Sequence, residues 1–129
     1  APPPNLNPAW WAPHTGYTLA KMGMSFVTLG LAAEFRDRGV AVNALWPRTV
    51  IATDALKMIP GVEVSRCRTP EILADAAHVI LTTPSRERTG QFLIDEAVLG
   101  AAGMSEFDQY AVDPDQELMP DLFLDEALP

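Results

Sequence analysis

Residues 17–47, YTLAKMGMSFVTLGLAAEFRDRGVAVNALWP, decide the fold of this chain. They begin inside a longer segment, residues 15–38, in which apolar residues recur every three or four positions and predict a helix with one apolar stripe. Gly39 follows directly after a basic last turn, which is typical of a helix end. Residues 40–45 then predict a short buried strand, which Pro47 ends. The stripe consists of Leu19, Met22, Phe26, Leu29 and Ala33.

Downstream of this stretch the chain continues to alternate helices and strands. Residues 69–71, Thr-Pro-Glu, combine a cap, a proline suited to the first helical turn and an acid at the positive end of the helix. They predict a helix from there to about Thr82. The remaining predictions are a short helix over 53–59 that stops at Pro60 and Gly61, a strand over 91–95, a helical turn over 97–103 and a short third strand over 110–112.

The two ends of the chain have unusual compositions. Residues 1–13 contain five prolines and predict an extended loop without a helix, in which Trp10 and Trp11 either pack on the core or wall a substrate pocket. Residues 91–129 hold ten acidic residues and no lysine or arginine. This acidic end is either a solvated tail or a segment that docks on a basic surface of its own fold or of a partner.

Composition limits what the chain can be. With 129 residues, 48% of them apolar, it forms one globular domain at most. A net charge of −8 repels phosphate backbones and argues against nucleic-acid binding. No apolar run reaches the ~18 residues that cross a bilayer, so we expect no membrane partner. The single cysteine, Cys67, excludes an internal disulfide and indicates the cytoplasm, and no His or Cys spacing suggests a metal site.

The order of elements predicts an α/β fold with a parallel sheet. A doubly wound sheet has about six strands, whereas this chain supplies two or three. The chain also begins with alanine rather than methionine. We therefore expect the C-terminal half of a Rossmann-type doubly wound sheet, without its N-terminal nucleotide-binding half. Its expected parts are a Pro/Trp-rich loop over 1–14, a helix-strand-helix-strand unit over 15–96 and an acidic tail over 97–129.

Tyr17 and Lys21 carry the candidate chemistry. Four residues apart on the predicted helix, their side chains share one face. A free tyrosine has a pKa of about 10, too high for easy proton exchange at neutral pH. A nearby ammonium group favours the phenolate and lowers that pKa, so the phenol can act as acid or base toward a carbonyl or alcohol oxygen. By itself the pair is also compatible with an amphipathic surface.

The surrounding pattern is more specific. Tyr17-x-x-x-Lys21, a helix, a strand running into Asn43-x-x-x-Pro47 and then Thr53 follow one another in the order and spacing of the short-chain dehydrogenase/reductase family. The chain resembles the C-terminal half of that family. Residues 43–49 and 120–126 are similar to its hydroxysteroid dehydrogenase-like branch.

This resemblance implies an NAD(P)-dependent oxidoreductase acting on a small apolar carbonyl or alcohol substrate, with NADP favoured over NAD, no metal, and a homodimer or homotetramer. Tyr17 would exchange the proton, and Lys21 would lower its pKa and bind the nicotinamide ribose. The substrate would lie near Trp11 and His14. The other residues that would contact the cofactor are Pro47, Thr49, Val50, Ile51 and Thr53.

A different class of function remains open. The chain has no glycine-rich phosphate loop, and Ala1 stands where the family places a serine. The isolated chain is then expected to be inactive. The alternative is a non-catalytic interaction protein that retains half of a dehydrogenase fold.

Overall fold

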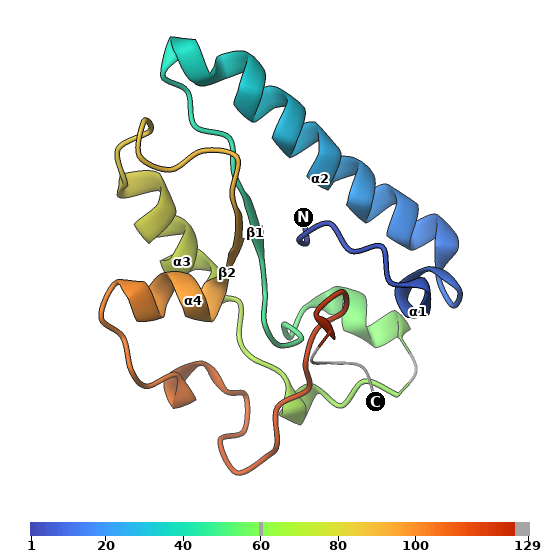
Figure 1. Cartoon of the computed structure of the whole chain (residues 1–129). Helices are drawn as coiled ribbons and strands as arrows, with labels where there is room; N and C mark the ends of the chain where they lie inside the picture. The colour runs from blue at the N-terminus through green and yellow to red at the C-terminus, as the bar shows by residue number, and fades with distance from the viewer. Residues whose placement is uncertain (60, 126–129) are drawn as a thin grey trace.

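The computed structural model describes residues 1–59 and 61–125. Pro60, half of the expected Pro-Gly stop, and residues 126–129 of the expected tail lie outside the described residues. Two parallel strands form the centre, with α2 on one side of them and α3 and α4 on the other (Figure 1). Their bounds are α1 Pro8–Trp11, α2 Thr15–Phe35, β1 Ala44–Trp46, α3 Glu71–Thr82, β2 Phe92–Ile94 and α4 Asp95–Ala101.

The predicted helix 15–38 forms as α2, which continues into a 3₁₀ turn over Arg36–Arg38 before Gly39. Gly39 has a φ of 71°, the left-handed conformation that ends helices and favours glycine. The predicted apolar stripe is wrong as a description of the buried face. Apart from Met22 its members are exposed, Leu19 by 63% and Phe26 by 54%. The buried residues are Thr18, Met22, Ser25, Thr28 and Ala32.

Hydroxyl groups explain why a face with little apolar surface can be buried. Thr18 Oγ1 donates a hydrogen bond to the carbonyl of Trp10, and Ser25 Oγ donates to the carbonyl of Pro2. A buried hydroxyl with a partner costs little, and small side chains let the N-terminal segment approach the helix closely. Figure 1 shows that segment running between α2 and β1.

Both strands are shorter than predicted, although their places are right. β1 begins near the end of the predicted stretch 40–45, extends one residue beyond it to Trp46, stops before Pro47 and pairs in parallel with β2. Ala44 donates its N–H to Gln91 in the direction of β2, so the backbone of Leu45 points to the opposite edge. There the carbonyl of Leu45 accepts a hydrogen bond from the amino group of Ala1, at 3.2 Å. Because β1 pairs with a full strand on one edge only among the described residues, its ladder of backbone hydrogen bonds is short.

The helix predicted from residues 69–71 forms as α3 and ends at Thr82 as expected. A hydrogen bond from Thr69 lowers the pKa of Glu71 in its first turn. Residues 54–58 form a 3₁₀ turn rather than an α-helix, and the predicted turn over 97–103 is α4, which begins earlier, at Asp95.

Two predictions for irregular segments are wrong. Residues 8–11 form the short helix α1, because Pro8 takes the first helical position, where no N–H is needed, and Asn7 accepts a hydrogen bond from the N–H of Ala9. The third strand over 110–112 is absent from the described residues. In its place lie a 3₁₀ turn over Asp108–Tyr110 and a single bridge between Arg68 and Ala111.

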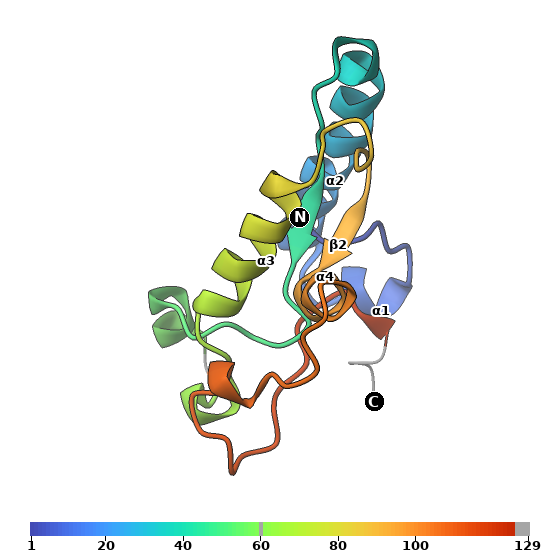
Figure 2. The same cartoon turned by 90° about the vertical axis from the view of Figure 1, so that its left-hand side faces the viewer.

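The side chains of the two strands alternate between two core clusters. Leu45 and Leu93 pack in the cluster with residues of α3 and α4, whereas Trp46 and Ile94 pack in the cluster with Met22 of α2. These helices lie on opposite sides of the two strands (Figures 1 and 2). This alternation is what the two-residue period of a strand requires. The cluster under α3 and α4 is built around Ile51, Ile72, Ala76, Val98, Leu99 and Tyr110, and the other around Trp10, Met22, Trp46 and Phe123.

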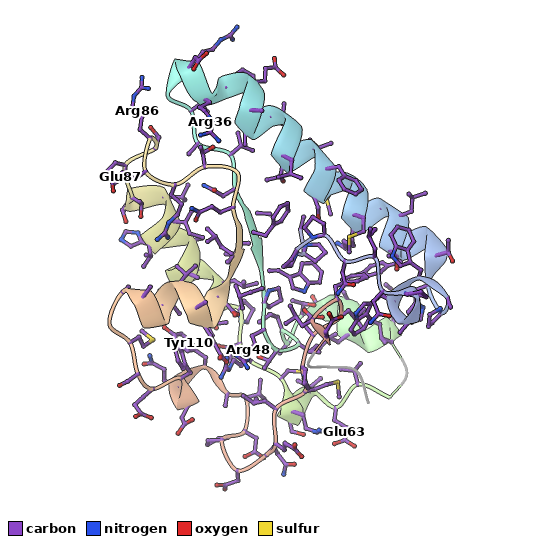
Figure 3. All side chains as sticks on the ribbon, in the orientation of Figure 1. Arg36, Arg48, Glu63, Arg86, Glu87 and Tyr110 are labelled. Atoms are coloured by element: carbon purple, nitrogen blue, oxygen red, sulfur yellow. The ribbon has the colours of Figure 1, made fainter. Side chains whose placement is uncertain are left out.

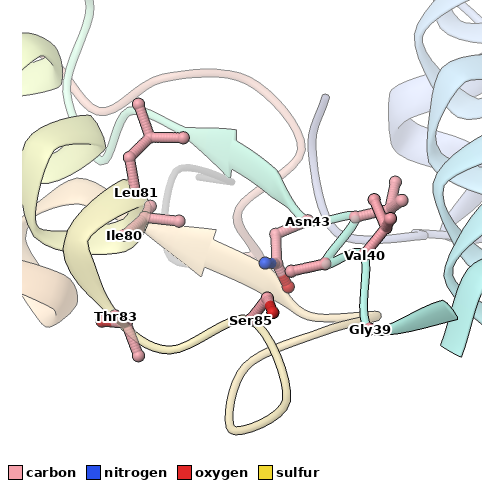
Figure 4. Close-up of a pocket in the computed structure, with 9 residues that line it drawn as sticks. Gly39, Val40, Asn43, Ile80, Leu81, Thr83 and Ser85 are labelled. Atoms are coloured by element: carbon pink, nitrogen blue, oxygen red, sulfur yellow. The ribbon is translucent and has the colours of Figure 1, made fainter. Parts of the chain in front are cut away.

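An open hollow of about 580 Å³ lies before β1, lined by residues 39–43 and by side chains from the end of α3 onward, including Ile80 and Ser85 (Figure 4). It is therefore at the amino end of the sheet. Parallel sheets bind their ligands at the carboxyl ends of the strands, so the functional site is sought at the other end. Within the described residues no helix is both long and apolar enough to cross a bilayer.

Candidate active site

The carboxyl end of β1 leads into a loop, residues 47–53, that faces the N-terminal part of α2. Tyr17 and Lys21 lie on that helix, and the Lys21 Nζ is 5.3 Å from the centroid of the Tyr17 ring and 5.9 Å from that of Trp46. The ammonium group thus lies over both aromatic faces, where it is attracted electrostatically. The structure brings together the two side chains that the sequence pattern paired.

The phenol of Tyr17 is 45% exposed, yet its pKa is raised. Partial burial is the main cause and the carboxylate of Asp121 the second. The expectation that Lys21 lowers this pKa is not met in the described chain. The ammonium lies over the ring face, and Asp121 acts against it. A raised pKa keeps the phenol protonated, the form that donates a proton.

The loop 47–53 divides its residues between the core and the surface. Ile51 packs in the cluster under α3 and α4, so only its backbone could meet a cofactor. Thr53 is exposed, and Val50 is half-buried with its N–H donated to the carbonyl of Met119. The hydroxyl of Thr49 is buried and has no hydrogen-bond partner among the described residues. Such an atom fits a polar group supplied from outside this part of the chain.

Two further predicted residues flank the site. Trp11 is half-buried and donates its indole N–H to the carbonyl of Asn5, at 3.0 Å. His14 is exposed at the N-terminus of α2 and makes no side-chain capping bond. Neither contact assigns a substrate, and the described residues contain no group of three or more side chains suited to a metal ion.

The sequence reasoning missed a segment at the acidic end, residues 119–125, which we call the strap. The strap crosses the end of the sheet. Val50 donates its N–H to the carbonyl of Met119, and Asp121 donates its own to the carbonyl of Arg48. Trp46 Nε1 donates to the carbonyl of Leu122 at 3.0 Å. Of the two interpretations of the acidic end, docking on its own fold therefore holds for the strap, through apolar and backbone contacts rather than a basic surface.

Asp121 is the titratable group of the strap that faces this site. Burial raises its pKa to about 6, Asp95 adds to the rise, and the hydrogen bond from the Leu122 N–H and the charge of Lys21 oppose it. The carboxyl therefore titrates near pH 6, and it interacts electrostatically with both Tyr17 and Lys21. The sequence signal for this burial was the apolar run Leu122-Phe123-Leu124 between two aspartates.

We expect Asp121→Asn to stabilise the chain at neutral pH. Above about pH 6 the folded and unfolded states both carry the ionised carboxyl, and burying that charge costs about 3 kcal/mol. As the pH falls through about 6 toward about 4, the folded state takes up the proton first, so the free energy of unfolding of the unsubstituted chain rises. Urea denaturation at about pH 7 and about pH 5 should show this rise and its loss in the variant. Equal pH dependence in both chains would contradict the assignment.

A buried ionic cluster fixes the start of the loop. Asp95, fully buried at the start of α4, accepts the N–H groups of Arg48 and Glu96, and burial raises its pKa. Arg68 forms an ion pair with Glu96. Arg48, labelled in Figure 3, has its Nε 3.4 Å from the same carboxylate. Although both residues are acidic, Asp95 and Glu96 are therefore not merely a solvated end of β2. The cluster ties the loop 47–53 to α4.

Solved structures share the fold of this chain. A crystal structure of a candidate dehydrogenase from Xanthomonas campestris superposes with a TM-score of 0.93 and 68% sequence identity, over 96% of this chain and 46% of that one. A short-chain dehydrogenase from Mycobacterium thermoresistibile gives a TM-score of 0.86 and 44% identity, over 100% of this chain and 46% of that one. The chain therefore has the α/β fold of part of a short-chain dehydrogenase, as its sequence predicted.

Comparison with curated protein sequences points to one group of dehydrogenase-like proteins. The chain is 54% identical over 126 residues to hydroxysteroid dehydrogenase-like protein 2 of Danio rerio and 51% identical over 128 residues to that of Homo sapiens. The two alignments cover 97–98% of this chain and 30% of each relative, so the chain spans less than a third of the length of these relatives. No protein-family model matches the chain. The resemblance to the hydroxysteroid dehydrogenase-like branch is thereby confirmed.

Proposed function

We propose that this chain carries the proton-transfer part of an NAD(P)-dependent short-chain dehydrogenase that acts on a small apolar carbonyl or alcohol. The observation that carries the proposal is the pairing of Tyr17 and Lys21 at the carboxyl end of β1, with the ammonium 5.3 Å from the phenol ring centroid. A parallel sheet binds ligands at that end. The match to dehydrogenases over nearly the whole chain supports the proposal.

The residues present fit a nicotinamide cofactor. Lys21 would bind its ribose, and the unpartnered hydroxyl of Thr49 would meet a polar group of the ring. The backbone of the loop 47–53 would cover it. When bound, the cofactor supplies or accepts the hydride. Tyr17 holds the proton: its phenol donates to the oxygen of a carbonyl substrate or takes the proton back from an alcohol, and the raised pKa of the free chain favours donation.

The apolar side chains around the site match the proposed substrate. Trp46 lies in the core next to the Lys21 ammonium, and the half-buried Trp11 packs against the same aromatic cluster. Aromatic surroundings favour a substrate with little charge. NADP is the favoured cofactor of the pair, and the test below compares both.

The decisive experiment places this chain in a complete domain. Residues 1–125 replace the matching 46% of the Xanthomonas campestris relative, whose 68% identity and TM-score of 0.93 make the exchange conservative. The chimera is titrated with NADPH and NADH by nicotinamide fluorescence and assayed with a series of apolar ketones. The 129-residue chain is measured alongside. Cofactor binding and ketone reduction by the chimera are expected, and a folded chimera with neither would favour the interaction-protein alternative.

We also propose a homodimer or homotetramer formed through α2. Leu19 and Phe26 are exposed on that helix, and a Cβ added at Gly23 or Gly30 would meet nothing within 4 Å. A helix face with several large exposed apolar side chains is normally covered by another protein surface. Light scattering of the chimera should give a mass of two or four copies, and Phe26→Glu should lower it to one. A monomeric chimera would contradict this proposal.

A further inference from the structure

Phe123 lies at the centre of the strap and at the centre of the aromatic cluster. It is 2% exposed, and its ring centroid is 5.7 Å from that of Trp10 and 5.9 Å from that of Trp46. Both tryptophan rings are tilted against it, by 54° and 56°. Phe123 is thus enclosed by aromatic rings from α1 and β1.

The Tyr17 ring contacts Phe123 in a different geometry. The two rings are nearly parallel, with 13° between their planes and 6.1 Å between their centroids. Tyr17 is half-exposed on a helix, so few other contacts of the described chain restrict its ring. The ring contacts Phe123 and the ammonium of Lys21. The orientation of the phenol therefore depends on the strap.

The backbone of Phe123 is held in a conformation that its side chain does not favour. Its φ is 69°, and among the described residues no other non-glycine residue has a positive φ. A bulky residue in this region is a genuine outlier, and such strain persists where the surroundings over-determine it. Here hydrogen bonds hold the strap on both sides of Phe123, from Trp46 to Leu122 and from Asn5 to Asp125.

We propose that Phe123 is a positioning residue for Tyr17: the strap holds the phenylalanine ring flat against the phenol and so sets the direction in which the phenol oxygen points. The effect on catalysis rests on the proposed function. The effect on the orientation of Tyr17 rests on the ring contacts alone. Placement of the donor to within a fraction of an ångström is what proton transfer to a bound carbonyl requires.

A tyrosine titration tests the contact without any activity. The chain has two tyrosines, and Tyr110, hydrogen-bonded to Asp75, has its pKa raised to about 12, so Tyr17 ionises first. The groups that face Tyr17 are Lys21 and Asp121. We compare tyrosinate absorbance in the unsubstituted chain and in Phe123→Gly, a change that removes the ring and suits the positive φ. Circular dichroism at each pH monitors folding.

The expected result is a lower pKa of Tyr17 in Phe123→Gly, because the phenol loses the ring that covers it and burial is the main cause of its raised pKa. Leu99→Ala, in the cluster under α3 and α4, is the matched core control and should leave the pKa of Tyr17 unchanged. Phe123→Leu replaces Phe123→Gly if the latter unfolds. An unchanged pKa of Tyr17 in the folded variant overturns the proposal.

The catalytic arm uses the chimera. Phe123→Gly should lower kcat at least about tenfold at an unchanged KM for NADPH, and Phe123→Tyr, which keeps a ring, should restore it. Leu99→Ala should keep its kcat. An unchanged kcat in Phe123→Gly overturns the positioning role. A chimera that binds no cofactor would contradict the proposed function. The tyrosine titration would then still test the contact between Phe123 and Tyr17.

Discussion

Tyr17→Phe lowers the rate of ketone reduction by the chimera by about 10²- to 10⁴-fold, the range that a positioned general acid contributes. The substitution removes one hydroxyl from a half-exposed ring and keeps the ring that stacks on Phe123. The fold and the aromatic cluster are therefore retained. We expect an unchanged dissociation constant for NADPH and an unchanged KM within a few fold, because the lost interaction acts in the transition state.

Tyr110→Phe is the control for this substitution. It removes the other tyrosine hydroxyl of the chain, which donates to Asp75 on α3 at 2.6 Å and whose hydrogen-bond partners Asp75 and Met104 lie outside the candidate site. This variant should keep the reduction rate of the parent and lose only some stability. If Tyr17→Phe also retained the parent rate, the phenol would not be the proton donor and the proposed mechanism would be wrong.

Arg68→Met lowers the free energy of unfolding by about 3 kcal/mol or more at neutral pH. The side chain of Arg68 is only 7% exposed, pairs with Glu96, lies over the Phe107 ring and faces the buried Asp95. Methionine fills a similar volume but removes the buried cation that faces Asp95 and leaves Glu96 with only the exposed Arg48 among the described residues. Removing one partner of a buried ion pair is costly because the other charge stays desolvated. Urea denaturation followed by circular dichroism measures the loss.

The matched control uses the other cation of the same cluster. Arg48 reaches the same carboxylate, at 3.4 Å, but its side chain is 48% exposed. Arg48→Met should therefore cost less than about 1 kcal/mol, since exposed ion pairs contribute little and the backbone N–H that bonds Asp95 is retained. Equal losses in the free energy of unfolding for the two variants would show that burial does not determine how much each arginine stabilises the fold.

Local signals in the sequence were sufficient for the elements that local chemistry controls. The Thr-Pro-Glu start places α3, Gly39 ends the helix segment, and Pro47 follows the last residue of β1. Tyr17 and Lys21 could be paired because four residues on a helix bring side chains to one face. The resemblance to short-chain dehydrogenases added the rest of the fold, and the comparisons confirm it.

Contacts between distant residues were not predictable in this way. The apolar pattern of α2 does not tell which of its faces meets the N-terminal segment, since hydroxyls of Thr18 and Ser25 can be buried once carbonyls accept from them. Acidic composition likewise hid the strap, because the tryptophans that receive Phe123 lie far away in the sequence. The raised pKa of Tyr17 follows from that burial.

The hydrogen bond from Asn5 to the carbonyl of Phe123 joins residues 118 positions apart. Closing so long a loop carries a large entropic cost, whereas β1, α3 and β2 meet over a shorter separation. Regions that depend on the last contacts to form open first in native-state fluctuations. We expect amide hydrogens of the strap to exchange faster than those of α3. The arrangement of the candidate site would then be lost in partial openings that leave the rest of the domain folded.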